Sequence, residues 1–263
     1  RLGLKEETHV TQAYNLLLAK ENIELEGIYS HFGTLGVYDK EWDTQLKRFR
    51  ELTKNIDLSK IKMVHFARGQ NVINHKKIPE TNGIRLGISM YGYVNNFSAK
   101  ATSLKGKIRQ YLLSRERKKL GLSYCIFDDV PKVTPAFSLK SEVLQIKEVK
   151  KGEIVGYGDG YRAPSDILVA TIPVGYADGV SVKNSGRCVD INGKLYKIVG
   201  TVNMCMLSVA VDNTVKVGDT VIIIGGKADA KYVADYLGVN RYIVVTTVAS
   251  NIPRVYIKKS EDE

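Results

Sequence analysis

The stretch Ile61–Gly92 reads IKMVHFARGQNVINHKKIPETNGIRLGISMYG and alternates strand and helix signals. KMVHFARG (62–69) and GIRLGISMYG (83–92) are rich in apolar and β-branched residues and predict two strands. QNVINHKKIP (70–79) between them predicts a short helix. A strand–helix–strand order predicts parallel strands joined by a crossover helix.

The residues before this stretch continue the same alternation. IELEGIYSHF (23–32) predicts a strand between two segments of helical spacing, 4–21 and 39–55. The apolar faces of these helices are Val10, Tyr14, Leu17 and Leu18 in the first, and Trp42, Leu46, Phe49 and Leu52 in the second. This order predicts part of an α/β barrel.

The second half of the chain consists mainly of predicted β-strands. Strands are predicted within AFSLKSEVLQIKEV, DILVATIPVGYA, RCVDINGKLYKIVG, MLSVAVD and DTVIIIGG, and a last strand in RYIVVTTVA (241–249). Asn192-Gly193 predicts a tight hairpin turn, and ADAKYVADYLG (228–238) a short helix ended by Gly238. The fold class is therefore part of a TIM-type α/β barrel followed by a mostly β domain. We expect the barrel part in 1–95, a basic insertion in 96–130 and the β domain in 131–263.

The net charge of +11 comes largely from one stretch of the chain. Between Lys100 and Lys119 there are eight Lys/Arg against the single acid Glu116. The stretch has few aromatic residues and no recognisable nucleic-acid motif, so we favour a solvated basic segment over a patch for an acidic partner. We expect no nucleic-acid partner.

Cysteine spacing and hydropathy indicate an ordinary cytoplasmic protein. Cys125, Cys188 and Cys205 lie far apart and have no metal-ligand spacing, which is typical of reduced thiols. We expect no metal site. No apolar run is long enough to span a bilayer and no signal peptide opens the chain, so we expect no membrane association.

Polar residues follow each strand predicted in the first half. His31 follows GIYS, His65 lies within MVHF, and Arg85 lies in GIRLG. The carboxyl ends of parallel strands are where barrel enzymes place their sites. A lone histidine there is more often a buried structural residue, but three positions in successive units favour a site. Gly87 leaves room for a backbone amide to approach an anion.

A near-repeat in the second half raises a separate question. GYGDG (156–160) and GYADG (175–179) each hold one tyrosine, Tyr157 and Tyr176. Each motif is compatible with a tight turn that carries an exposed tyrosine. The residues alone leave open whether this is a repeated turn or a pair of phenols delivered to one place.

A series of longer motifs shows which protein family the sequence resembles. EGIYSHF, VHFA, IRLGISMYG, AFSLKSEVLQIKEVKKGEIVGYG, TIPVGYADG, KIVGTVNM, VGDTVIIIG and IPRVY follow one another after an initial RLG. This order resembles the alanine racemase family, over roughly residues 1–95 and 131–258. The resemblance implies pyridoxal phosphate as cofactor, an N-terminal barrel and a C-terminal β domain.

The resemblance also implies catalytic roles. Tyr157 matches a base on one face of the cofactor-bound amino acid, and a lysine that carries the cofactor serves the other face. Tyr176 matches a residue that shapes the substrate entrance. A phenol is a weak base near neutral pH, so the Tyr157 phenol needs help from a neighbour. His31 matches the family histidine that hydrogen-bonds this tyrosine. Arg85 matches the arginine on the pyridine nitrogen. An arginine can only donate, so it leaves that nitrogen largely unprotonated and limits side reactions.

Binding residues carry over in the same way. Gly87 and Ile88 match backbone amides that hold the cofactor phosphate, and Tyr242 matches a phosphate-contacting tyrosine. Arg1 matches the arginine that binds the substrate carboxylate, and Met204 a residue whose amide touches the same carboxylate. The resemblance implies a head-to-tail homodimer in which Tyr157, Tyr176 and Met204 come from the partner subunit.

The chain departs from the family pattern at several points. The cofactor-bearing lysine is expected upstream of Arg1, so these residues are expected to be a C-terminal portion that is inactive alone. Arg68-Gly69 replaces the usual Asn-Ser after VHFA, and Cys205-Met206 replaces Asp-Gln. The segment 96–130 is expected to be an insertion. The alternatives are a serine/alanine racemase of the vancomycin-resistance kind and a non-catalytic dimerising remnant, with nucleic-acid binding third.

Overall fold

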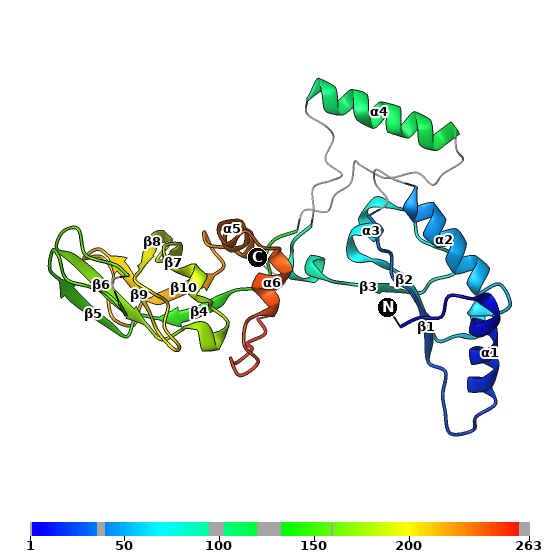
Figure 1. The fold of residues 1–263 in the computed structure, drawn as a ribbon, viewed down its shortest axis with the longest axis horizontal. Coiled ribbons are helices and arrows are strands. Elements are labelled where there is room, and N and C mark those ends of the chain that lie inside the picture. The colour runs from blue at the N-terminus through cyan, green and yellow to red at the C-terminus, as the bar shows by residue number, and fades with distance from the viewer. Residues whose placement is uncertain (1, 36–39, 95–102, 120–132, 159, 258–263) are drawn as a thin grey trace. The chain divides into compact units, whose positions relative to one another are not determined.

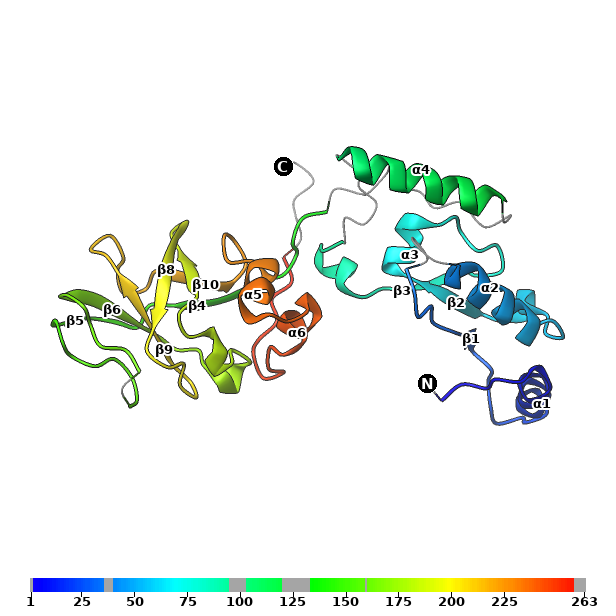
Figure 2. The same cartoon turned by 45° about the horizontal axis from the view of Figure 1, so that its top comes forward.

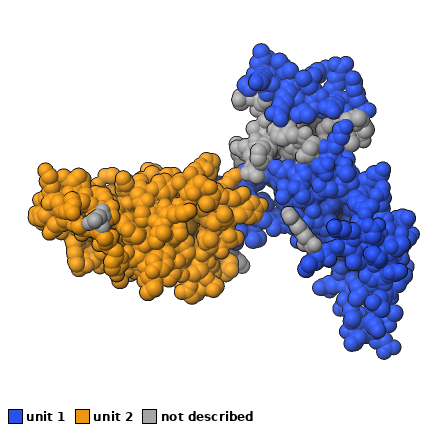
Figure 3. All heavy atoms as spheres, viewed as in Figure 1, with its two compact units in different colours: residues 1–134 blue, residues 135–263 orange. Residues whose placement is uncertain are grey.

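A computed structural model describes residues 2–35, 40–94, 103–119, 133–158 and 160–257. The chain divides into two compact units, residues 1–134 and 135–263, which Figure 3 colours separately. Each unit has its own sheet, and each is described by itself.

Unit 1 contains a three-stranded parallel sheet in the order β1-β2-β3 (Figure 1). The strands are β1 (Gly27–Tyr29), β2 (Met63–Arg68) and β3 (Gly83–Arg85). Its helices are α1 (Glu7–Leu18), α2 (Glu41–Leu52), α3 (Gly69–Asn74) and α4 (Leu104–Lys119), with 3-10 turns at Leu58–Lys60 and Ile88–Tyr91. The βαβ order predicted from the sequence is thus present.

An aromatic stack forms the core of unit 1. The ring of Phe32 lies 3.9 Å from that of Trp42 and 3.8 Å from that of Phe66, and Trp42 stacks on His75 at 3.9 Å. Trp42 belongs to α2 and Phe66 to β2, while Phe32 follows β1, so the stack packs α2 against the first two strands. Leu18, predicted on the apolar face of α1, is exposed because the helix ends there.

The third strand is shorter than predicted. β3 ends at Arg85, and a 3-10 turn begins at Ile88. Gly92 then ends that turn in the left-handed region, with φ 77°. The chain therefore leaves the sheet directly after Arg85, where the predicted site residues lie.

Unit 2 contains a seven-stranded sheet in the order β4-β10-β7-β8-β9-β6-β5, in which all neighbours are antiparallel. The strands are β4 (Leu139–Glu142), β5 (Gln145–Val149), β6 (Ile167–Ile172), β7 (Cys188–Ile191), β8 (Lys194–Val199), β9 (Leu207–Val211) and β10 (Thr220–Ile224). Figure 2 shows that the sheet curls, with α5 (Ala230–Leu237) and α6 (Arg241–Thr246) at one end. Shorter 3-10 turns cover Tyr176–Asp178 and Val182–Asn184.

The hairpin predicted at Asn192-Gly193 is confirmed. It joins β7 to β8, and the two residues have φ of 53° and 77°. Two consecutive left-handed residues are what a type I′ turn needs, and its twist matches that of the flanking strands.

The strand predicted over 241–249 is wrong, because Arg241–Thr246 forms α6. The side chain of Asn240 caps this helix by accepting from the Tyr242 amide at 3.1 Å. Val244 and Val245 are buried. A cap and two buried apolar side chains outweigh the strand propensity of a β-branched run, which is a weak local preference.

The basic segment falls only partly within the described residues. Leu104–Lys119 form α4, whose described side chains are exposed or half-exposed, in agreement with a solvated helix. Residues 95–102 and 120–132 lie outside the described residues. No helix in the described parts of the chain has the length and apolar character that crossing a membrane requires.

Candidate active site

The structure brings together the three polar residues predicted at the strand ends of unit 1. Arg85 Nε donates to His31 Nδ1 at 3.0 Å, and Arg85 Nη1 lies 3.4 Å from His65 Nδ1. Tyr29, which sequence reasoning did not single out, stacks on His65 at 5.3 Å and lies 4.8 Å below the Arg85 guanidinium. Parallel register explains the meeting, because Tyr29 pairs with His65 and Arg68 pairs with Arg85.

The surroundings of both histidines favour the neutral ring. Burial and the positive charge of Arg85 lower the pKa of His31 and of His65, and Arg68 lowers that of His31 further. Because His31 Nδ1 accepts from Arg85, the ring proton of His31 lies on Nε2. His31 is exposed and is therefore not a buried structural histidine. Its Nε2–H is available to donate to another group.

These shifts give a prediction for pH dependence. A histidine with a lowered pKa takes up its proton later in the folded state than in the unfolded state, so stability should fall as the pH drops below about 6.5. In NMR titrations of the four histidines, Arg85→Met should raise the pKa of both His31 and His65. Arg68→Met should raise only that of His31. Unchanged titration of both rings in Arg85→Met would contradict the arrangement.

The turn after β3 carries groups suited to an anion. The amides of Gly87 and Ile88 donate no hydrogen bond within the described residues, and Arg68 Nε is buried without a partner there. A Cβ on Gly69 would come within 3.0 Å of Ser89 Oγ, so the Ser89 hydroxyl occupies space that a side chain at position 69 would need. No described carboxylate forms an ion pair with Arg68 or Arg85. The donor set fits a phosphate group.

The near-repeat in unit 2 consists of two different turns. Tyr157 is 78% exposed and lies between Gly156 and Gly158, whose φ values of 88° and 63° are left-handed. Tyr176 is 50% exposed and opens a 3-10 turn. Gly175, in the second turn, is extended, and its amide donates to the Asp178 carboxylate at 2.9 Å. The similar letters therefore do not encode a repeated turn.

One segment nevertheless lies against both turns. At its start, Gly200 packs so closely on the Val155 carbonyl that a Cβ would overlap it. At its end, the Asn203 carbonyl accepts from Tyr176 N at 3.0 Å and the Met204 carbonyl accepts from Ala177 N at 2.9 Å. The segment 200–204 thus links the backbones that carry both tyrosines, and Met204 lies beside the second. The Met204 amide donates no hydrogen bond within the described residues.

The remaining predicted residues divide between the units. His31, Arg85, Gly87 and Ile88 belong to unit 1, whereas Tyr157, Tyr176, Met204 and Tyr242 belong to unit 2. Tyr242 lies in α6 with 47% of its surface exposed. Arg1 lies outside the described residues. Within the described ranges, no three His, Cys, Asp or Glu side chains gather as a metal site would require.

Comparisons with protein families match both halves of the chain. The family described as "Alanine racemase, N-terminal domain" matches residues 1–95, and "Alanine racemase, C-terminal domain" matches residues 136–256. An alanine racemase of Clostridium novyi is 30% identical over 99% of this chain, and alanine racemase 1 of Clostridium acetobutylicum is 33% identical over 99%. The chain spans 63% of the length of each of these relatives.

Solved structures agree with the sequence comparisons. The alanine racemase from E. faecalis matches 98% of this chain, which covers 63% of that structure, with a TM-score of 0.74 and 27% identity. A histidine racemase from Leuconostoc mesenteroides also matches 98% of this chain and is covered over 63%, with a TM-score of 0.72 and 25% identity. The barrel-type and β-domain architecture expected from the sequence is therefore confirmed.

Proposed function

Because the chain belongs to the alanine racemase family, we propose that its residues serve the interconversion of L- and D-alanine with pyridoxal phosphate as cofactor. The observation that carries the proposal is the contact between Arg85 Nε and His31 Nδ1 at the carboxyl ends of the parallel strands. A positively charged donor and a neutral histidine meet there without a carboxylate, as a pyridine-nitrogen site of this family requires.

Each residue has a defined task in this proposal. The cofactor, when bound, withdraws electrons from the α-carbon and so makes its proton removable. Arg85 is permanently charged and can only donate a hydrogen bond, so a ring nitrogen beside it stays largely unprotonated. His31 donates from Nε2 and orients the phenol of Tyr157. Tyr157 then takes and returns the α-proton on one face.

We assign binding of the cofactor phosphate and the substrate carboxylate mainly to groups whose hydrogen-bond donors have no partner among the described residues. The amides of Gly87 and Ile88, together with Tyr242, hold the cofactor phosphate, and the Arg68 guanidinium adds positive charge beside them. Arg1 and the Met204 amide take the substrate carboxylate, and Tyr176 borders the entrance. We propose that the active protein is a homodimer whose site combines unit 1 of one protomer with unit 2 of its partner.

The test uses the natural gene product that carries these residues, purified with pyridoxal phosphate. Incubation with L-alanine should produce D-alanine, and L-serine should react more slowly. L-Histidine is a useful third substrate because one similar structure is a histidine racemase. Faster turnover of serine than alanine would favour the serine/alanine alternative. A stable dimer that racemises none of these three amino acids would favour the alternative that the protein is a non-catalytic dimerising remnant.

A further inference from the structure

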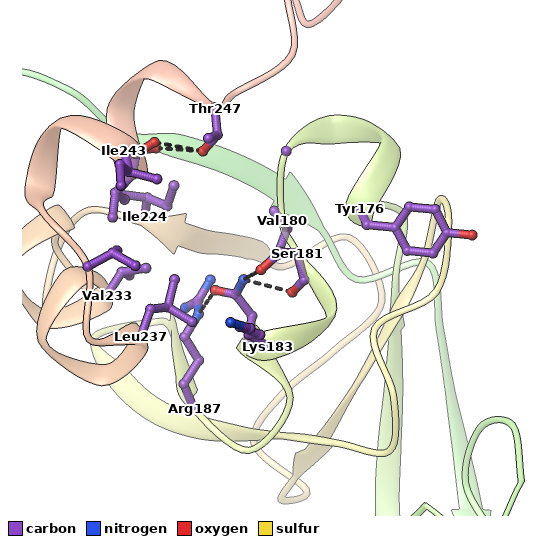
Figure 4. Close-up of a pocket in the computed structure, with 14 residues that line it drawn as sticks. Tyr176, Val180, Ser181, Lys183, Arg187, Ile224, Val233, Leu237, Ile243 and Thr247 are labelled. Atoms are coloured by element: carbon purple, nitrogen blue, oxygen red, sulfur yellow. Dashed lines mark hydrogen bonds between the residues drawn. The ribbon is translucent and has the colours of Figure 1, made fainter.

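A cavity of about 380 Å³ lies within unit 2, under α5 and α6 (Figure 4). Its walls are mostly apolar and are formed by Ile224, Val233, Leu237, Val239, Ile243 and Val244. The Arg187 guanidinium points into this ring of side chains, whereas the ring of Tyr176 points away from it. The cavity is large enough for a small ligand.

Arg187 is the only charged residue in this wall that is buried, with 1% of its surface exposed. Its Nε donates to Asn184 Oδ1 at 2.6 Å, and its Nη1 donates to the Cys188 carbonyl at 2.9 Å. Its Nη2 has no hydrogen-bond partner among the described residues. Both acceptors are neutral, so no described carboxylate balances the charge.

A buried cation without a counter-ion is unfavourable, because burial removes its hydration and two neutral acceptors replace that hydration only in part. Burial lowers the pKa of Arg187 to about 10, so the group is still protonated at neutral pH. Asn184 is itself fixed, since its amide donates to the Ser181 carbonyl at 2.8 Å. The unpaired N–H therefore lies buried beside a partly open, mostly apolar cavity, with its charge unmatched.

We propose that this cavity binds a small monocarboxylate with a short apolar chain, whose carboxylate pairs with Nη2 of Arg187. One buried positive charge matches one negative charge, and the apolar wall suits a hydrocarbon chain rather than a multiply charged phosphate. Lys183, exposed at the rim, adds a positive charge that attracts anions. Nη2 has almost no exposed surface, so binding requires a neighbouring side chain of the wall to move aside.

Of the residues assigned to the racemase function, the cavity shares only Tyr176, whose ring points away from it, so the test below is separate from that of racemisation. Sodium butyrate is titrated by calorimetry into the 263-residue chain in carboxylate-free buffer, with sodium chloride and butanol as references. Butyrate should bind saturably and raise the melting temperature, and neither reference should do so. A wild-type chain that gives no saturable butyrate binding overturns the proposal.

Two matched variants separate the buried charge from the rim charge. Arg187→Met should weaken butyrate binding by about tenfold or more, because it removes a hydrogen bond to a charged group. Lys183→Met removes a charge from the same cavity but an exposed one, and should change the affinity by less than about threefold. Val239→Phe keeps Arg187 but fills the cavity, so it should also abolish binding. Wild-type affinity in both Arg187→Met and Val239→Phe overturns the proposal.

Discussion

Tyr157→Phe should slow alanine racemisation by about 10²–10⁴-fold in both directions, in any preparation that is active with alanine. The substitution removes the proton acceptor on one face of the substrate and keeps the ring. Racemisation needs proton transfer on both faces, so both directions lose rate together. Because Tyr157 is largely exposed in unit 2, removing its hydroxyl leaves the fold intact.

Isotope exchange distinguishes this role from a structural one. In Tyr157→Phe, the α-proton of one alanine enantiomer should still exchange with solvent deuterium, while that of the other should not. Tyr176→Phe is the matched control, because it removes a phenol from the neighbouring turn, and it should change mainly KM. Equal exchange of both enantiomers in Tyr157→Phe would assign the base to another group.

Gly179→Ala should destabilise unit 2 by about 4 kcal/mol or more, a loss that only a few kinds of substitution cause. Gly179 has φ 96°, and a Cβ there would come within 3.0 Å of the Thr247 carbonyl oxygen. The backbone after α6 would have to move, which would also disturb the segment that carries Tyr242. Far-ultraviolet circular dichroism during urea unfolding measures the loss.

Gly218→Ala is the control for this substitution. Gly218 has φ 88° but no heavy atom within 4 Å of the position of a Cβ, so it tests the left-handed conformation alone. It should cost about 1–2 kcal/mol. The fluorescence of Trp42, the one tryptophan of the chain, follows unit 1 and should change less in either variant. Equal losses in the two glycine variants would show that the Thr247 contact is unimportant.

The sequence predicted features that follow from local turn rules or from the order of its strands. Asn192-Gly193 predicted its hairpin because two left-handed residues in succession favour one turn type. The meeting of His31 with Arg85 followed from parallel strands, whose carboxyl ends share one edge. The resemblance to alanine racemases was likewise visible in long motifs such as GIRLGISMYG.

Features that depend on distant contacts could not be predicted. The run RYIVVTTVA has strand propensity, but the Asn240 cap and the burial of Val244 and Val245 make it helical. Gly175 and Gly179 look alike in the sequence, but Gly175 makes room for the Asn203 carbonyl and Gly179 for that of Thr247. The unmatched charge of Arg187 depends on which carboxylates the fold leaves out of reach.

The pairing of β4 with β10 has a consequence for how the protein is made. Glu142 at the end of β4 pairs with Thr220 at the start of β10, 220 − 142 = 78 residues later in the chain. At about 5–20 residues per second, a ribosome needs roughly 4–16 s to synthesise that interval. During this time β4 has been synthesised but its partner β10 has not. Pairing of the two strands closes a large loop, which slows folding further. A nascent chain that stalls before Thr220 therefore exposes an unpaired strand to chaperones and proteases.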